Sequence, residues 1–307
     1  MTIKQFLNEF EDIVKKIRKK RIVVMLGGFG EEREASIYTG EQVFKALKDA
    51  EFNSILIDPS TTNITKLLNS RTDIVFNCLH GSFGESGHLP AILDYLKIPY
   101  TFSGIYPSVV TMDKLYFSSI VKKLGVLIPQ DNIDNPDLIS GYKDNTILKK
   151  IRGGGSIGMK ISTTGKVPEA FFCQKFINEG NIITLGILES KNIYIPLGIV
   201  EVKLKDKEFY DQDSKYLEGF SSYIKYKGKN SKLIIDESIK IFKFLSIKGA
   251  ARIDFIERKN KIYLLEINSV PGLYEDSNLV YSASLSGLSF YQLVIWILSN
   301  SGFEKLL

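Results

Sequence analysis

Two acidic residues near the C-terminal end of the sequence have the spacing of a metal site. Asp254 and Glu266 stand in two apolar runs, and the polar segment 257–261 between these runs predicts a β-hairpin. Because side chains alternate along a strand, Arg252 shares a face with Asp254, and Asn268 likewise shares a face with Glu266. Oxygen ligands at this spacing suit Mg²⁺, which keeps waters and substrate phosphates as its other ligands. The alternative is that Arg252 pairs with one carboxylate and only holds the hairpin together.

A lysine beside a glycine-rich turn predicts a second charged site. Lys149 lies in an expected strand over residues 146–151, which runs into the glycine-rich segment 152–159 and a further strand. Glycines let backbone N–H groups approach an anion, and a neighbouring lysine adds positive charge. The pattern favours phosphate binding over the alternative, a merely flexible hairpin.

The sequence after residue 20 predicts the start of a doubly wound unit. An apolar strand at 21–26 leads through the glycine turn 27–30 into a helix that ends near residue 50, and ligands bind at the carboxyl ends of such strands. The spacing is not that of a dinucleotide-binding turn, and Glu32 and Glu34 would repel a pyrophosphate. The loop suits an ammonium group better, unless the two carboxylates only complement the helix dipole.

One of the two histidines occupies a position typical of a functional residue. His80 follows an expected strand at 73–79 and opens the glycine-rich loop 80–87. Residues at the carboxyl end of a strand and in such a loop are well placed to contact a ligand. A purely structural histidine is the alternative.

The remaining periodicity predicts an ordinary mixed α/β protein. A length of 307 residues suits two or three domains, and a hydrophobic content of 44% with 24% charged residues is that of a soluble globular protein. Further expected strands and helices lie at 54–58, 89–97, 99–103, 108–124, 171–177, 182–188, 193–203, 234–247 and 289–300.

Charge and cysteine content exclude several classes of protein. The net charge of +5, from 40 Lys and Arg against 35 Asp and Glu, is spread along the chain, so nucleic acid is not an expected partner. Cys78 and Cys173 stand in unrelated contexts and indicate a reducing cytoplasm. No apolar run reaches the ~20 residues of a membrane span, and no signal-peptide core is expected.

Residues 1–20 predict one amphipathic helix with a basic end. Apolar residues recur at helical spacing, and the segment 15–20 is rich in Lys and Arg. Such a helix can lie on a membrane surface, but packing on its own domain or on a partner subunit is the favoured hypothesis.

Six short motifs follow one another between about residue 21 and residue 300. They are Gly27–Gly28 with Glu32–Ser36, Leu79–Gly81 with Gly84–Gly87, Met112–Lys114, Gly154–Met159, Tyr210–Asp211 with Lys215–Tyr216, and Glu266–Gly272. In this order they resemble the D-alanine–D-alanine ligases of the ATP-grasp superfamily, over nearly the whole chain. The resemblance implies an α/β and α+β fold of the ATP-grasp type. Its parts are an N-terminal doubly wound domain at 1–108, a shortened central lobe at 109–178 and a catalytic lobe at 179–307.

The resemblance also implies an enzyme, an ATP-dependent carboxylate–amine ligase. The carboxylate of one D-alanine would take the γ-phosphate of ATP, and the amine of a second would attack the acyl phosphate, giving D-alanyl-D-alanine for peptidoglycan and the cell wall. The implied cofactors are ATP and two Mg²⁺ ions, which Mn²⁺ could replace. A cytoplasmic homodimer is expected. Lysines and Mg²⁺ are suited to this chemistry because both reacting partners are anions.

Individual residues take their expected roles from the same resemblance. The metal ligands are Asp254, Glu266 and Asn268. The ATP-binding residues are Lys114, Lys149, Ser156, Gln174, Lys175, Phe176, Ile177, Phe209 and Lys215. The substrate-binding residues are Glu34, His80, Lys215, Gly272 and Ser277. The catalytic residues are Glu34, Ser156, Tyr216 and Arg252, with Arg252 stabilising the oxyanion and Tyr216 in a lid.

Some positions depart from the family pattern. Ile182 stands where a glutamate usually binds the ribose, with Glu179 close by. Gly155 replaces the first of two serines, and the segment 161–171 is short enough to lack a helix of the central lobe. Two alternatives therefore stay open: the same chemistry on other amino acids, and a non-catalytic ATP-grasp remnant that acts as a binding protein.

Overall fold

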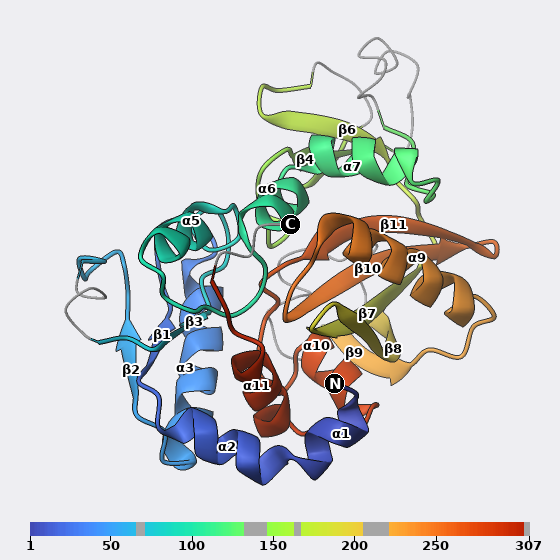
Figure 1. The fold of residues 1–307 in the computed structure, drawn as a ribbon. Coiled ribbons are helices and arrows are strands. Elements are labelled where there is room, and N and C mark those ends of the chain that lie inside the picture. Colours follow the sequence, from blue (N-terminus) through green and yellow to red (C-terminus); the bar gives the residue numbers. More distant parts are fainter. Residues whose placement is uncertain (66–70, 132–145, 163–166, 205–220, 304–307) are drawn as a thin grey trace.

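The computed structural model describes residues 1–65, 71–131, 146–162, 167–204 and 221–303. Three sheets carry this part of the fold, and Figure 1 shows the small central sheet at the top of the molecule, away from the N-terminal helices. In the described residues, no helix is both long and apolar enough to cross a bilayer.

The N-terminal sheet is parallel and covered on both faces. Its strands lie in the order β2 (Ser54–Ile57), β1 (Ile22–Met25) and β3 (Ile74–Asn77). Residues of β1 alternate between two hydrophobic clusters, one shared with α3 (Arg33–Asp49) and the other with α5 (His88–Tyr95). This arrangement confirms the predicted doubly wound unit, and the loops after β1 and β3 leave the same edge of the sheet. The strand expected at 99–103 is reduced to isolated bridges at Tyr100.

The central part is small. A three-stranded antiparallel sheet has the order β5 (Lys160–Ser162), β4 (Thr146–Lys150) and β6 (Phe171–Lys175). The helices α6 (Ile105–Met112) and α7 (Lys114–Lys123) precede it. No helix lies in the described residues between β5 and β6, as the short segment there predicted.

A five-stranded antiparallel sheet forms the C-terminal part. Its strands, in spatial order, are β11 (Lys261–Asn268), β10 (Ala250–Arg258), β7 (Asn181–Ser190), β8 (Ile193–Leu204) and β9 (Ser221–Lys225). The helix α9 (Ser231–Leu245) shares a hydrophobic cluster with β7 and β10, and α10 (Asn278–Ser284) belongs to a different cluster. The predicted hairpin is thus confirmed as β10 and β11.

The last helix returns to the beginning of the chain. In Figure 1, α11 (Phe290–Ser299) lies beside α3 and close to α2 (Phe10–Arg18). Phe6 of α1 (Ile3–Asn8) is fully buried, and its ring packs edge-on against Trp296, with 4.9 Å between ring centroids. The apolar face of the N-terminal segment is therefore covered by its own chain, which agrees with the favoured hypothesis.

Two predicted helices are each divided in the structure. The expected helix over 1–20 breaks at Glu9, which has φ −99° and ψ 5° between α1 and α2. The expected helix over 108–124 breaks at Asp113, whose side chain accepts hydrogen bonds from the N–H groups of Leu115 (3.1 Å) and Tyr116 (3.2 Å). Asp113 therefore caps α7, because its side chain satisfies N–H groups that a helix start leaves unpaired.

Candidate active site

Two cavities of different size lie beside the β10–β11 hairpin. The larger has a volume of about 630 Å³ and lies between the central and C-terminal sheets. The smaller has about 40 Å³ and lies between the loops of the N-terminal sheet and the segment that follows β11. The larger is in the range of a drug-sized or cofactor-sized ligand, whereas the smaller holds roughly three waters.

The cavities share two walls. In the glycine-rich segment, Gly155 lines the smaller cavity and the adjacent Ser156 lines the larger one. In the hairpin, Arg252 lines the smaller cavity and Asp254 the larger one. Ligands in the two cavities would therefore meet between the glycine-rich segment and the hairpin.

The hairpin register brings the predicted metal ligands together. Asp254 lies directly opposite Glu266, and Arg252 lies opposite Asn268. The guanidinium of Arg252 donates to both oxygens of Asp254, with Nε–Oδ1 at 3.0 Å and Nη2–Oδ2 at 2.9 Å. Asn268 and Thr184 also donate to Asp254. The ion pair considered as an alternative to metal binding thus exists in this structure.

The donor set still fits a hard cation. Asp254 and Glu266 supply carboxylates to the larger cavity, and Asn268, which has an amide oxygen, lines the adjoining smaller cavity. No described residues form a cluster of three or more His, Cys, Asp or Glu side chains that could hold a metal. A cation here would take its other ligands from waters and from a phosphate-bearing molecule, which is the usual coordination of Mg²⁺.

The larger cavity collects most of the residues expected to bind nucleotide. Lys149 lies at one end, where its ammonium donates to Gln174 Oε1 at 2.9 Å. Glu179 and Ile182 lie in the same lining, and the Glu179 carboxylate is 3.6 Å from Arg258 and 82% exposed. The predicted residues in this lining are Lys149, Ser156, Gln174, Lys175, Phe176 and Ile177.

Glu32 is the acidic residue of the N-terminal loop that lines the smaller cavity. Its carboxylate lies close to the glycine-rich segment, because a Cβ built on Gly154 would lie only 2.4 Å from Glu32 Oε2. Glu34 is exposed and absent from the lining. Residues two apart at a helix start differ in direction by about 200°, so both cannot point into one cavity. The structure therefore places Glu32, and not the predicted Glu34, in the cavity.

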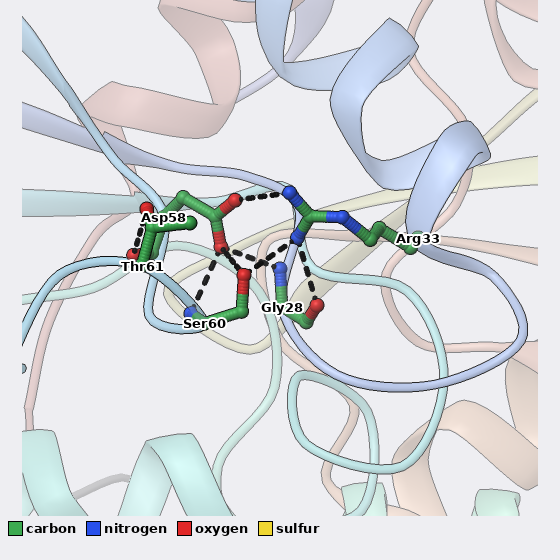
Figure 2. Close-up of polar contacts among 5 residues, drawn as sticks. All are labelled: Gly28, Arg33, Asp58, Ser60 and Thr61. Carbon is green, nitrogen blue, oxygen red and sulfur yellow. Dashed lines mark hydrogen bonds and ion pairs between the residues drawn. The ribbon is translucent and has the colours of Figure 1, made fainter.

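The turn that presents Glu32 is held by an ion pair (Figure 2). Arg33 Nη2 lies 2.6 Å from Asp58 Oδ2, and Nη1 donates to the carbonyl of Gly28 at 2.9 Å. The Gly28 N–H and Ser60 donate to the other oxygen of Asp58. Burial raises the pKa of Asp58, but the hydrogen bond from Arg33 and those from Gly28 and Ser60 outweigh it and hold that pKa well below its usual range.

Known proteins match this chain over most of its length. The family model "D-ala D-ala ligase C-terminus" matches residues 146–299. The D-alanine–D-alanine ligase of Aquifex aeolicus is 36% identical over 296 residues, which cover 91% of this chain and all of that protein. The ligase of Rickettsia typhi is 32% identical over 309 residues, with 94% of each chain covered. The chain belongs to the D-alanine–D-alanine ligase family.

Solved structures of this ligase family agree in fold. The D-alanine–D-alanine ligase of Bacillus anthracis complexed with ATP has a TM-score of 0.74 at 24% identity and covers 92% of this chain and 96% of its own. VanG D-Ala:D-Ser ligase from Enterococcus faecalis has a TM-score of 0.72 at 22% identity, covering 91% and 98%. The predicted ATP-grasp fold and the prediction of an ATP-dependent ligase are therefore confirmed.

His80 lines the smaller cavity of this ligase-family chain and has a fixed tautomer. Its Nδ1 lies 3.0 Å from the carbonyl oxygen of Val270, and its Nε2 lies 2.9 Å from Thr39 Oγ1. A carbonyl only accepts, so Nδ1 carries the hydrogen and Nε2 accepts from the hydroxyl. Desolvation lowers the pKa of His80 to about 4, so the ring is neutral at physiological pH.

A second carboxyl, Glu85, also lines the smaller cavity. It is 9% exposed, and its Oε2 accepts the N–H of Gly81 at 2.7 Å. Burial, followed by the charge of Glu32, raises the pKa of Glu85 to about 8. The lining of the cavity thus contains two carboxyl groups and the guanidinium of Arg252.

Of the remaining residues predicted to bind substrate or phosphate, some line a cavity and others do not. Gly272 lines the smaller cavity, whereas Ser277 caps α10, its Oγ accepting from Val280 N at 3.4 Å. Lys114 donates to the carbonyl oxygen of Gly153 at 2.5 Å and lines neither cavity, so it supports the glycine-rich segment. Phe209, Lys215 and Tyr216 lie outside the described residues.

Besides Glu32, the smaller cavity is lined by further residues that were not predicted as site residues, among them Glu85, Tyr274 and Asn278. Glu85 stands in the loop that begins with His80, and its acidic side chain in a glycine-rich loop was an available signal. Tyr274 and Asn278 line the cavity from the segment after Gly272. A tyrosine in a loop and an asparagine at the start of α10 give no comparable signal in the sequence.

Proposed function

We propose that this chain joins two D-alanine molecules to D-alanyl-D-alanine through an acyl phosphate, for peptidoglycan synthesis in the cytoplasm, with ATP and Mg²⁺ as cofactors. The observation that carries this proposal is the arrangement of the two cavities. A cavity large enough for a nucleotide adjoins a small cavity lined by charged groups, along the hairpin that carries Arg252, Asp254 and Glu266. A phosphoryl group could therefore pass from one ligand to the other beside the proposed metal ligands.

The amino group of the first D-alanine belongs between Glu32 and Glu85. Both carboxyl groups line the smaller cavity, and the charge of Glu32 acts on Glu85. A substrate ammonium there would favour the ionised form of Glu85, whose pKa burial and the charge of Glu32 raise, and would form charge-assisted hydrogen bonds with both groups. In this proposal Glu32 takes the role that the sequence motif suggested for Glu34.

The phosphates of ATP belong at the end of the larger cavity that holds Lys149, Ser156, Asp254 and Glu266. Mg²⁺, when bound by Asp254, Glu266 and Asn268, would neutralise phosphate charge and lower the electrostatic barrier between two anions. The adenine belongs near Lys175, Phe176 and Ile177, and Lys114 acts by supporting the glycine-rich segment.

Arg252 is suited to stabilise the oxyanion that forms when the second amine attacks. Its guanidinium is 12% exposed and is oriented by two hydrogen bonds to Asp254, so it needs little reorganisation during the reaction. The neutral ring of His80 is hydrogen-bonded to the carbonyl of Val270, so it stabilises this wall of the cavity without adding charge. Gly272 supplies backbone to the second amino acid. For Lys215, Phe209 and Tyr216, the nucleotide-binding and lid roles stay proposals from the family motif, as do Ser277 as a carboxylate ligand and the division of the chain at residues 108 and 178.

The test is incubation with MgATP and a panel of D- and L-amino acids, following phosphate release and product mass. D-Alanyl-D-alanine formed only from D-alanine supports the proposal. A different dipeptide would support the alternative of a changed substrate, which Gly155 in the smaller cavity motivates. No phosphate release at millimolar ATP, together with no nucleotide binding by calorimetry, would exclude both enzymes. Light scattering during the same preparation tests the expected homodimer.

A further inference from the structure

Tyr274 forms part of the smaller cavity and has no role in the proposal above. It follows Gly272 by two residues and packs on its backbone, because a Cβ built on Gly272 would lie 2.9 Å from Tyr274 Cε1. Burial raises the pKa of Tyr274 to about 12, so the phenol is neutral at physiological pH. The ring therefore acts in the cavity through its volume rather than through charge.

A second tyrosine supports this ring from the N-terminal part of the chain. Tyr38 of α3 lies 5.1 Å from Tyr274 between ring centroids, with an angle of 52° between the ring planes. Tyr38 is 50% exposed and does not line the cavity. The pair thus bridges the N-terminal helix α3 and the segment after β11, with Tyr38 on the solvent side and Tyr274 on the cavity side.

The other groups around this end of the cavity have little freedom to move. The carbonyl of Val270 is hydrogen-bonded to His80, and Pro271 is buried. Asn278, at the start of α10, is 2% exposed. The cavity has a volume of only about 40 Å³, so a bulky substrate side chain could not enter it without displacing a group of the lining. Tyr274 is the largest side chain in this lining, so it sets how much space a substrate side chain has.

We propose that Tyr274 is a specificity-determining residue, which restricts the second amino acid to a small side chain such as that of alanine. This inference rests on the proposed function. In the proposed function, Glu32 and Glu85 bind the first amino group and Gly272 contacts the second amino acid, and Tyr274 packs directly on Gly272. Replacing the ring by a methyl group should open that end to larger D-amino acids.

The experiment compares the full-length protein with Tyr274→Ala in mixtures of D-alanine with D-2-aminobutyrate or D-valine. Product masses and the order of residues in each dipeptide are read by tandem mass spectrometry. In Tyr274→Ala, kcat/KM for the larger residue relative to D-alanine should rise about tenfold or more, since one methylene in a pocket changes selectivity by about 10–200-fold. The larger residue should enter only the C-terminal position of the dipeptide.

Matched variants separate this role from a general loss of structure. Tyr274→Phe keeps the ring and should retain the selectivity of the wild type. Tyr95→Ala removes a tyrosine that is 86% exposed and lines neither cavity, and should also leave selectivity unchanged. If Tyr274→Ala does not fold, Tyr274→Val, which keeps a branched side chain but removes the ring, takes its place.

A ratio that changes less than twofold in a folded variant, or larger residues in the N-terminal position, would overturn the inference. The proposed function fails separately, if the wild type makes no D-alanyl-D-alanine. Should the wild type make another dipeptide, the same ratio is measured for the second residue of that product, so the role of Tyr274 is still decided.

Discussion

The guanidinium of Arg252 donates two hydrogen bonds to the carboxylate of Asp254, although the two side chains line different cavities. The ion pair therefore connects the proposed phosphate–metal end of the site with the end at which the peptide bond would form. A substitution of either residue should therefore alter the position of the other side chain, since both residues lie on β10 two positions apart.

Replacing Arg252 by lysine tests this connection. The variant keeps the positive charge but loses the planar fork that contacts both Asp254 oxygens. We expect kcat to fall about 10²–10³-fold, the usual effect of removing one oxyanion donor. Steady-state phosphate release measures kcat, and a thermal melt of both proteins shows whether the fold is kept. A folded Arg252→Lys enzyme with nearly normal kcat would remove Arg252 from the proposed chemistry.

The hairpin carboxylates are tested by Glu266→Ala. Without this ligand the proposed cation site loses one of its two carboxylates, so turnover should fall by about 100-fold or more at saturating MgATP. Glu275→Ala is the matched control, because Glu275 is exposed, lies in the segment after β11 and is absent from both linings. Undiminished turnover in Glu266→Ala would show that the metal assignment is wrong.

Glu32 and Glu34 form a natural pair for testing the ammonium site. Glu32→Gln removes a charge from the smaller cavity, and KM for D-alanine should rise about 10–100-fold, the value of one charge-assisted hydrogen bond. Glu34→Gln changes an exposed side chain and should alter KM less than twofold. Initial rates at varied D-alanine and saturating ATP give both constants. A larger rise in KM for Glu34→Gln than for Glu32→Gln would instead support the prediction from the sequence motif, in which Glu34 binds the substrate.

Asp58 should stabilise the N-terminal unit in a pH-dependent manner. Its pKa in the folded protein is lower than in the unfolded chain, so its contribution is present above the unfolded pKa of about 3.9 and is lost as pH falls through the lower, folded value. Asp58→Asn should lower the free energy of unfolding at pH 7 by about 1–3 kcal/mol. Urea unfolding of both proteins at several pH values measures this difference, which should shrink below about pH 4. A difference that stays constant down to pH 3 would contradict the ion-pair explanation.

Local patterns in the sequence predicted much of the architecture correctly. The alternation around Asp254 and Glu266 predicted the hairpin, and apolar continuity predicted the buried strand β1 and its glycine turn. Such signals are local, because a strand repeats every two residues and a helix every 3.6 residues. The sequence pattern did not predict the breaks in the two divided helices. Glu9 and Asp113 interrupt periodic apolar patterns, because residues on both sides of each break face hydrophobic cores.

The sequence by itself determined the family, the order of the motifs and the residue types available for ligation. These depend on residues that are close in the chain. Only the tertiary structure decided which side chains meet. It selected Glu32 over Glu34 through the direction of a helix start, paired Arg252 with Asp254, and brought Tyr274 against Tyr38 from 236 positions earlier in the chain. The contact between Tyr274 and Tyr38 arises because distant parts of the chain pack together, and no periodic signal within one segment carries that information.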